Sequence, residues 1–198
     1  MPRPGDRRPR IADAAISVLA QGGARTLTHQ SVDRAAGIAL GSTSYYFRTR
    51  RDLVVAVIQR VRVHSRAASD DANPPDAVTI DGAAALIDDQ LRRLATERRD
   101  QALSVFALLP EVEDDGELRG ELARCLFSRD LAADLLTALG AADPVRDALD
   151  FNDFLTGLLF GLLFGQRRDT ESPEDGLAQA IARFLRSCQS PAIGGVSG

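Results

Sequence analysis

The chain has 198 residues, of which 44% are hydrophobic, 26% charged and 5% aromatic. This apolar content can fill the core of one large domain or two small ones, and it argues against disorder and collagen. Cys125 and Cys188 lie far apart and the only histidines are His29 and His64, so neither a disulfide framework nor a metal-ligand spacing is indicated. The longest apolar run, residues 154–165, is too short to span a bilayer, and we expect a cytoplasmic protein without a signal peptide.

Charge is distributed unevenly along the chain. Residues 1–66 hold 12 arginines against four aspartates and no glutamate, a formal charge of +8, whereas residues 67–198 carry −12. A basic segment joined to an acidic one is typical of a polyanion-binding region attached to a part that does not bind polyanions. A chance fluctuation in surface charge is the alternative at this point.

The basic segment reads as a series of short helices. A first helix ends at Gly22–Gly23, Thr28 is the predicted cap of a second helix that stops at Gly37, a very short third helix covers residues 40–47, and Thr49 caps a longer fourth. A helix, a tight glycine turn and a short helix within about 20 residues are the geometry of a helix-turn-helix. The first helix is predicted from apolar residues at helical spacing, namely Ile11, Ala14, Ala15, Val18 and Leu19.

Helical patterns continue through the acidic region. We predict helices over residues 81–98, 101–112, 116–140, 144–166 and 173–188, with Asp143-Pro144 and Ser172-Pro173 each read as an N-cap followed by proline at the first helical position. No alternating strand pattern stands out, so the expected fold is all-α. Residues 191–198 are expected to form a flexible tail.

Residues 11–53 hold a distinctive set of residues. These are Ala35-Ala36-Gly37-Ile38, Ser42 with Tyr45-Tyr46-Phe47, and then Thr49, Arg50 and Leu53. In this pattern the segment resembles the DNA-binding domain of the tetracycline-repressor (TetR) family of transcription regulators. The resemblance implies an N-terminal helix-turn-helix domain over residues 1–50, a fourth helix that links it to a ligand-binding and dimerisation domain over residues 51–190, and a homodimer.

The same resemblance assigns roles in DNA binding. Arg50 stands where the family usually has a lysine that anchors the start of the fourth helix, while Leu40 and Gly41 depart from the polar side chains often found there, so that DNA shape gains weight in recognition. The positions that match base contacts are Gln30, Leu40, Gly41 and Ser42. Those that match phosphate contacts are His29, Ser44, Tyr45, Tyr46 and Arg50, and Thr43 and Arg48 complete the expected DNA-binding set.

Several of these residues have a second interpretation. Tyr45 and Tyr46 could instead be core aromatics, although Phe47 is the better core candidate. The basic leader could be an arm near the DNA or a disordered, solvated segment, which we expect over residues 1–8. The arginines of this leader region are Arg3, Arg7, Arg8 and Arg10.

Candidates for an effector site are polar groups on otherwise apolar helices and aromatic residues near the core. They are His64, Gln90, Phe106, Phe127 and Asn152. His64 could equally be a core histidine with satisfied hydrogen bonds, and Gln90 and Asn152 could face solvent. Phe151 and Phe160 are expected in the core.

A dimer interface is predicted from three glycines at four-residue spacing, since glycine inside a helix is costly unless it permits a close contact. A tight contact within one chain is the alternative interpretation. The predicted interface residues are Gly157, Gly161 and Gly165, completed from the last helix by Leu177, Ile181 and Phe184.

The function favoured by these observations is a ligand-responsive DNA-binding transcriptional regulator, a repressor released from an inverted-repeat operator by a small apolar molecule. A constitutive or architectural DNA-binding protein without a ligand is the alternative. An enzyme is disfavoured because the sequence has no nucleophile elbow, phosphate-binding loop or zinc-protease motif, and no cofactor or metal is expected. The acidic residues Glu111, Glu113, Asp114, Asp115 and Glu117 are expected to form a solvated loop.

Overall fold

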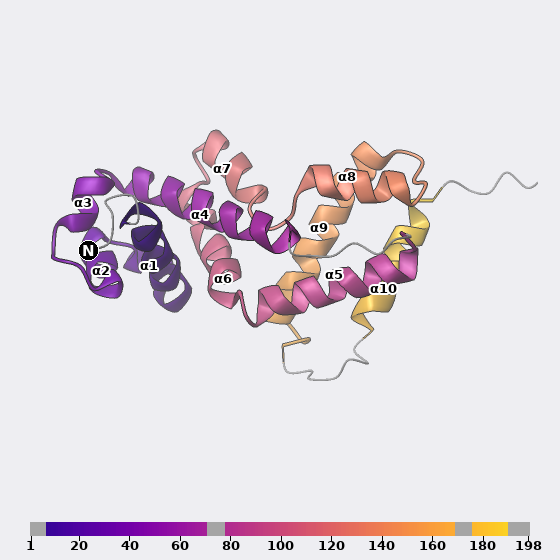
Figure 1. Cartoon of the computed structure of the whole chain (residues 1–198), viewed down its shortest axis with the longest axis horizontal. Coiled ribbons are helices and arrows are strands. Elements are labelled where there is room, and N and C mark those ends of the chain that lie inside the picture. Colours follow the sequence, from indigo (N-terminus) through magenta and orange to yellow (C-terminus); the bar gives the residue numbers. More distant parts are fainter. Residues whose placement is uncertain (1–6, 71–77, 169–175, 190–198) are drawn as a thin grey trace, which may run out of the picture. The chain divides into compact units, whose positions relative to one another are not determined.

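A computed structural model describes residues 7–70, 78–168 and 176–189 (Figure 1). The regular elements of these residues are helical, with one isolated β-bridge between Ala141 and Gln189, so the predicted all-α fold is confirmed. The α-helices are α1 (Arg7–Gly22), α2 (His29–Ala36), α3 (Ser42–Tyr46), α4 (Arg50–Asp70), α5 (Ile80–Ala95), α6 (Arg99–Leu108), α7 (Gly116–Ala123), α8 (Arg129–Ala138), α9 (Pro144–Leu163) and α10 (Leu177–Ser187). Two 3-10 turns are η2 (Ala24–Thr26) and η3 (Leu109–Glu111).

The chain divides into two compact units. The first combines Met1–Ala72 with Leu94–Phe127, and the second combines Asn73–Arg93 with Ser128–Gly198. The helix-turn-helix therefore shares its unit with α6 and α7. The functional boundary expected near residue 50 stays a prediction.

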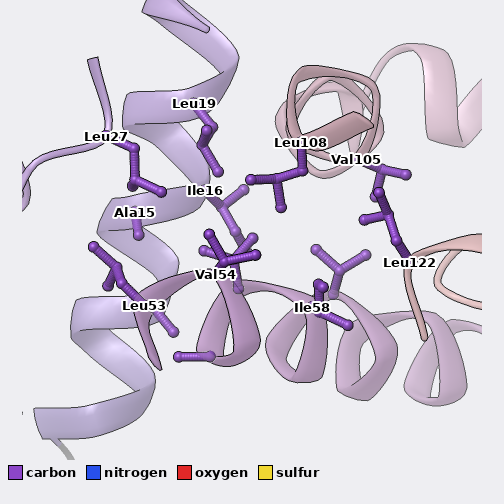
Figure 2. Packing of buried hydrophobic residues seen from close by; sticks show 14 of the residues in the cluster. Ala15, Ile16, Leu19, Leu27, Leu53, Val54, Ile58, Val105, Leu108 and Leu122 are labelled. Carbon is purple, nitrogen blue, oxygen red and sulfur yellow. The ribbon is translucent and has the colours of Figure 1, made fainter. Parts of the chain in front are cut away.

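The first unit has one continuous hydrophobic core, to which α1, α2, α4, α6 and α7 contribute (Figure 2). Leu19 of α1 and Ile58 of α4 lie in it with Leu108 of α6 and Leu122 of α7, and all four are almost completely buried. Complete burial of such a side chain contributes about 1.5–3 kcal/mol relative to exposure. Helix α4 is thus held by apolar contacts both to the helix-turn-helix side and to α6 and α7.

Side-chain caps set the ends of the short N-terminal helices where the sequence predicts them. Thr28 Oγ1 accepts the Ser31 backbone N–H at 3.1 Å, and Ser31 Oγ accepts the Thr28 N–H at 3.0 Å. Gly37 ends α2 in the left-handed region at φ 61°. Thr49 and Asp52 exchange the same pair of bonds at the start of α4, at 3.0 and 2.9 Å. These three predicted helix ends are confirmed.

Other boundaries differ from the prediction. The helix expected over 116–140 is two helices, because the chain turns to bury Cys125 against the carbonyl of Ile58 and α8 then starts at a new cap, Ser128. Asp143 and Pro144 do begin α9 as predicted. The Ser172-Pro173 pair lies outside the described residues, and α10 begins at Leu177 after Gly176.

The basic leader is also more ordered than expected. Arg7, Arg8 and Arg10 belong to α1, so these three are neither a disordered leader nor a free arm. Arg10 donates to the carbonyl of Ala36 at 2.7 Å and thereby covers the end of α2. Arg3 lies outside the described residues.

The second unit packs α10 against α9 through aromatic side chains. Phe184 lies 5.2 Å from Phe151 and 4.9 Å from Phe154 between ring centroids, and Phe151 is buried as predicted. Arg186 pairs with Asp81 of α5 at 2.6 Å. Within the described ranges, no helix combines the length and the apolar character needed to cross a membrane.

Candidate nucleic-acid interface

The short helix α3 is positioned by a buried carboxylate of the preceding helix. Asp33 Oδ2 accepts the Gly41 N–H at 2.7 Å and Oδ1 accepts the Thr43 N–H at 2.8 Å. A helix of five residues is not stable alone, and its first N–H groups have no partner within the helix. Asp33 supplies partners for two of the N–H groups at this helix start and so fixes α3 on α2.

Asp33 stays ionised in this environment. Burial alone would raise its pKa, but the hydrogen bonds from Thr43 and Gly41 favour the charged form and the pKa lies below its ordinary value. Sequence reasoning gave Asp33 no role, because an aspartate inside an amphipathic helix resembles a solvated residue. The signal that could have found it is its spacing, eight residues before a glycine that starts a second helix.

The backbone conformation at position 41 explains why this residue is glycine. Its φ of 88° lies in the left-handed region, which residues with a side chain rarely adopt. The missing side chain noted at this expected base-contact position is therefore required by the turn between α2 and α3.

The outward face of α3 differs from the predicted set at one residue. Thr43, expected among the DNA contacts, is fully buried because it lies on the face of α3 that packs on α2, so this prediction was wrong. Tyr45 is 80% exposed, Leu40 is 68% exposed, and Phe47 is in the core as predicted. Gln30, Gly41, Ser44 and Arg48 are exposed as well, while Ser42 and Tyr46 are half-buried.

His29 braces the end of α3. Its Nε2 lies 2.7 Å from the Phe47 carbonyl oxygen, a distance at which this nitrogen must carry the proton and donate it. The N–H that was expected to reach a phosphate is therefore used inside the domain. His29 thus links the start of α2 to the residue that follows α3.

Arg50 also has internal partners in place of the expected phosphate. Its Nε donates to Glu111 Oε2 at 2.7 Å, its Nη2 to the Ala24 carbonyl at 2.6 Å, and its Nη1 to the Leu27 carbonyl. The hydrogen bond from Arg50 lowers the pKa of Glu111, which keeps that carboxylate charged. Arg50 thus ties the start of α4 to η2 and η3, and its role as a phosphate anchor stays a prediction.

Further arginines of α4 pair with acidic residues of the η3–α7 region. Arg51 Nε lies 2.9 Å from Asp115 Oδ2 and its Nη2 lies 3.4 Å from Glu117 Oε2, while Arg62 pairs with Glu121. The acidic segment was expected to be a solvated loop, and for Glu111 and Asp115 this was wrong, whereas the Glu117 side chain is 81% exposed. These pairs, with Arg50–Glu111, form what we call the α4 ion-pair ladder.

His64 is a satisfied histidine and not a free ligand donor. Its Nδ1 accepts from Gln101 Nε2 at 2.7 Å, and its Nε2 lies 3.5 Å from Asp13 Oδ1. Burial, with a further contribution from the Arg60 charge, lowers its pKa and keeps the ring neutral at neutral pH. Of the two interpretations of His64, the structure favours the structural one.

The other candidate effector residues are divided between the units. Phe106 and Phe127 are half-buried in the first unit, and Gln90 and Asn152 are half-buried in the second. The two hollows described in the first unit are lined by none of the five candidates. The effector set stays a prediction.

The predicted dimer residues separate into two groups. A Cβ added at Gly157 would meet no atom within 4 Å, and a Cβ added at Gly161 would meet only the side chain of Arg167. Gly165 lies beyond the end of α9 and packs on Gly161. The alternative of a tight contact within one chain therefore holds for Gly165 alone. Leu177 and Ile181 are completely buried in the single chain, so their placement in an interface was wrong.

The exposed side of α9 is apolar. Because its buried side is apolar too, the sequence pattern did not distinguish the two. Phe160 was expected in the core but is 53% exposed, and its ring centroid lies 5.2 Å from that of the 47% exposed Phe164, with the rings tilted to each other. Leu149 and Val145 are exposed on the same helix face, where Gly157 lies open. We call this surface the α9 face.

Comparisons with known proteins agree with this helix-turn-helix architecture. Residues 78–187 match the family described as "Tetracyclin repressor-like, C-terminal domain". The HTH-type transcriptional regulator BetI of Rhizobium meliloti (strain 1021) is 26% identical over 167 residues, which cover 81% of this chain and 77% of BetI.

Solved structures show the same fold. The multidrug binding protein EbrR complexed with imidazole has a TM-score of 0.65 and 28% identity over 95% of this chain and 98% of that chain. A TetR-family member from Streptomyces coelicolor A3 has a TM-score of 0.66 and 26% identity, covering 90% and 98% of the two chains. A transcriptional regulator from Rhodococcus sp. Rha1, 16% identical, shares the fold with a TM-score of 0.73 over 92% and 95%.

Fold and site together define a DNA-binding regulator of the helix-turn-helix class. The match over residues 78–187 is more specific, since it spans more than half of the sequence and lies outside the helix-turn-helix. The chain belongs to the TetR family of transcriptional regulators, and it is a regulator rather than an enzyme.

Proposed function

We propose that this protein is a homodimeric repressor that binds an inverted-repeat operator and is released from it by a small apolar molecule. The observation that carries the DNA-binding part is the position of α3: the helix is capped by buried Asp33 and presents Tyr45 to the outside, with Leu40 exposed in the turn before it. A rigid short helix with an exposed face suits insertion into the major groove. A cytoplasmic location belongs to the same proposal.

The chemistry of this face suits a mixture of base and backbone contacts. Leu40 can contact the methyl group of a thymine, while the hydroxyls of Ser42 and Tyr45 and the guanidinium of Arg48 can reach base edges or phosphates. Few side chains here can form bidentate hydrogen bonds to a base. Recognition by this head therefore relies in part on DNA shape.

The α9 face supports a two-fold dimer. Phe160 and Phe164 are partly exposed on this apolar face, and the open Gly157 leaves room for the close approach of a second helix. Two reading heads must then lie about 34–36 Å apart, or a multiple of it, to enter major grooves on one side of the duplex. A small displacement of α4 alters this separation without touching a base contact.

Release by a ligand is supported by the relatives. Structures of the multidrug binding protein EbrR hold imidazole, malachite green, ethidium and proflavin. The α4 ion-pair ladder offers a route for such a response here, since it joins the helix after the reading head to η3 and α7. An effector that moves η3 or α7 would shift α4.

A selection of genomic fragments tests the proposed function. Fragments of the source genome that bind the purified protein at about 0.15 M salt, close to physiological ionic strength, are recovered and sequenced. We expect an inverted repeat shared by the recovered fragments. Binding that is salt-sensitive and without a common motif would replace the repressor by an architectural DNA-binding protein. Absence of binding, also after refolding to remove a co-purified ligand, would contradict DNA binding altogether.

A further inference from the structure

A hollow lies beside the end of α3 that none of the expected base contacts uses. Its volume is about 460 Å³, and it is lined by Tyr45 and Tyr46 of α3, by Arg48, and by Arg8 from the first turn of α1. Arg8 is the only contributor to it from α1, some 40 positions away in the sequence. The fold therefore brings two arginines from distant segments to one concave surface next to the reading helix.

Aromatic rings hold Arg8 in place. Its guanidinium carbon lies 5.1 Å from the centroid of the Phe47 ring and 6.0 Å from that of Tyr46. Phe47 is in the core, so one wall of this arrangement is rigid. Because the Arg8 side chain is already held over a ring, it loses less conformational entropy when its N–H groups bind an anion.

Arg8 and Arg48 differ from the arginines of α4 in their partners. Arg50, Arg51 and Arg60 each pair with a carboxylate, whereas the described part of the chain gives the side chains of Arg8 and Arg48 no ion pair. Both are exposed. Their charges are therefore available to an anion from outside the protein.

One acidic residue also lines the hollow and has to be accounted for. Asp52 is ionised, since hydrogen bonds from Thr49 lower its pKa. Its Oδ2 accepts the Thr49 N–H at 2.9 Å, which directs this oxygen to the start of α4. The hollow is therefore lined by the two positive charges of Arg8 and Arg48 and the one negative charge of Asp52, so its net charge is positive.

We propose that this hollow binds one phosphodiester group of the DNA backbone, with Arg8 and Arg48 on either side and the Tyr46 hydroxyl as a further donor. This inference rests on the proposed function and extends the DNA contact surface to the first turn of α1. A phosphate is the anion that fits, because guanidinium groups bind it by paired N–H donors and the adjoining α3 is the reading helix. Arg8 then contributes affinity without sequence preference.

The test uses a fluorescently labelled 30-base-pair duplex of arbitrary sequence, so that no operator needs to be known. Binding anisotropy is measured for the full chain between about 50 and 200 mM salt, where the logarithm of affinity falls linearly with that of salt concentration. The variant Arg8→Met keeps the aliphatic stem on the rings and removes the charge. Arg8→Lys keeps the charge, and Arg66→Met removes one exposed arginine near the other end of α4.

We expect Arg8→Met to bind about tenfold more weakly and to flatten the salt slope by about 0.9 for each protomer bound. Arg8→Lys should keep the slope, and Arg66→Met should leave slope and affinity close to those of the wild type. An Arg8→Met slope equal to that of the wild type, or a change shared by Arg66→Met, would overturn the phosphate site while leaving the proposed function intact. A wild-type protein that does not bind the duplex at the lowest salt would instead overturn DNA binding itself, and this site with it.

Discussion

The Asp33 carboxylate of α2 accepts the Thr43 N–H of α3 at 2.8 Å, and both residues are completely buried. This bond makes the two helices of the helix-turn-helix one rigid piece. The exposed face of α3 with Tyr45, and the preceding turn with Leu40, are thus held in place by a buried charge that does not contact DNA.

Asp33→Asn should lower both the free energy of unfolding and the affinity for DNA. Asparagine has the same shape but offers one acceptor where the carboxylate offers two, so one N–H of Gly41 or Thr43 faces an NH₂ group. We expect a loss of about 1–3 kcal/mol in the free energy of unfolding, measured by urea titration. DNA affinity should fall even at temperatures where the variant is fully folded. Unchanged affinity in the folded variant would show that α3 does not need this cap.

Arg50→Ala and Glu111→Gln should lower stability and leave the salt slope of DNA binding unchanged. The guanidinium of Arg50 is bound to protein acceptors, and its 41% side-chain exposure limits the worth of its ion pair with Glu111. We expect losses of about 1–2 kcal/mol for Arg50→Ala, mostly from the lost hydrogen bonds to the Leu27 and Ala24 carbonyls, and less for Glu111→Gln. A double-mutant cycle isolates the pair itself. A slope reduced by about 0.9 per protomer in Arg50→Ala would restore the role of phosphate anchor.

The protein should lose stability in acid through the carboxylates of this unit. Asp33 and Glu111 have pKa values below their ordinary ones in the folded state, Asp33 despite the opposing effect of burial and Glu111 chiefly through its bond from Arg50. A lowered folded-state pKa means that the stabilisation is complete above the unfolded-state value, about 4, and disappears as the pH falls through the folded-state value. The free energy of unfolding should therefore decrease below about 4. A smaller decrease should begin below about 6.5, because the lowered folded-state pKa of His64 makes the unfolded state bind its proton first. Asp33→Asn should show a shallower decrease, and a curve parallel to the wild type would contradict this origin.

Gly157→Leu should dissociate the dimer without harming the protomer. A side chain there meets nothing inside the chain, and replacing glycine in a helix gains up to about 1 kcal/mol. Sedimentation velocity should show a shift from dimer to monomer at a given concentration. Leu177→Ala is the control: it should cost about 2–5 kcal/mol of stability because the residue is buried in the protomer. A Gly157→Leu protein that remains dimeric would move the interface away from the α9 face.

Local rules predicted the parts of the fold that depend on neighbouring residues. Thr28, Gly37 and Thr49 act at helix ends through bonds spanning three or four positions, so their roles can be read from the sequence. The break between α7 and α8 was missed because Cys125 turns inward to meet Ile58, a contact between distant segments.

The site was less predictable, because it too depends on contacts between segments that are distant in the sequence. Apolar spacing placed Ile181 and Phe160 on helix faces but could not tell the protomer core from a surface that awaits a partner. The partners of Arg50 and Arg51 lie more than 60 positions away along the chain. The resemblance marked Arg50 as a phosphate contact, and only the fold shows that Arg50 and Arg51 are already paired within the protein.

The central claim is a two-fold reader of DNA, and a DNase footprint on a fragment recovered by genomic selection tests it most directly. We expect two protected half-sites on one side of the duplex, with centres one helical turn or a multiple of it apart, about 34–36 Å per turn. Asp33→Asn should lose both half-sites together. A single protected site, or uniform protection along the fragment, would contradict a symmetric dimer that reads DNA through α3.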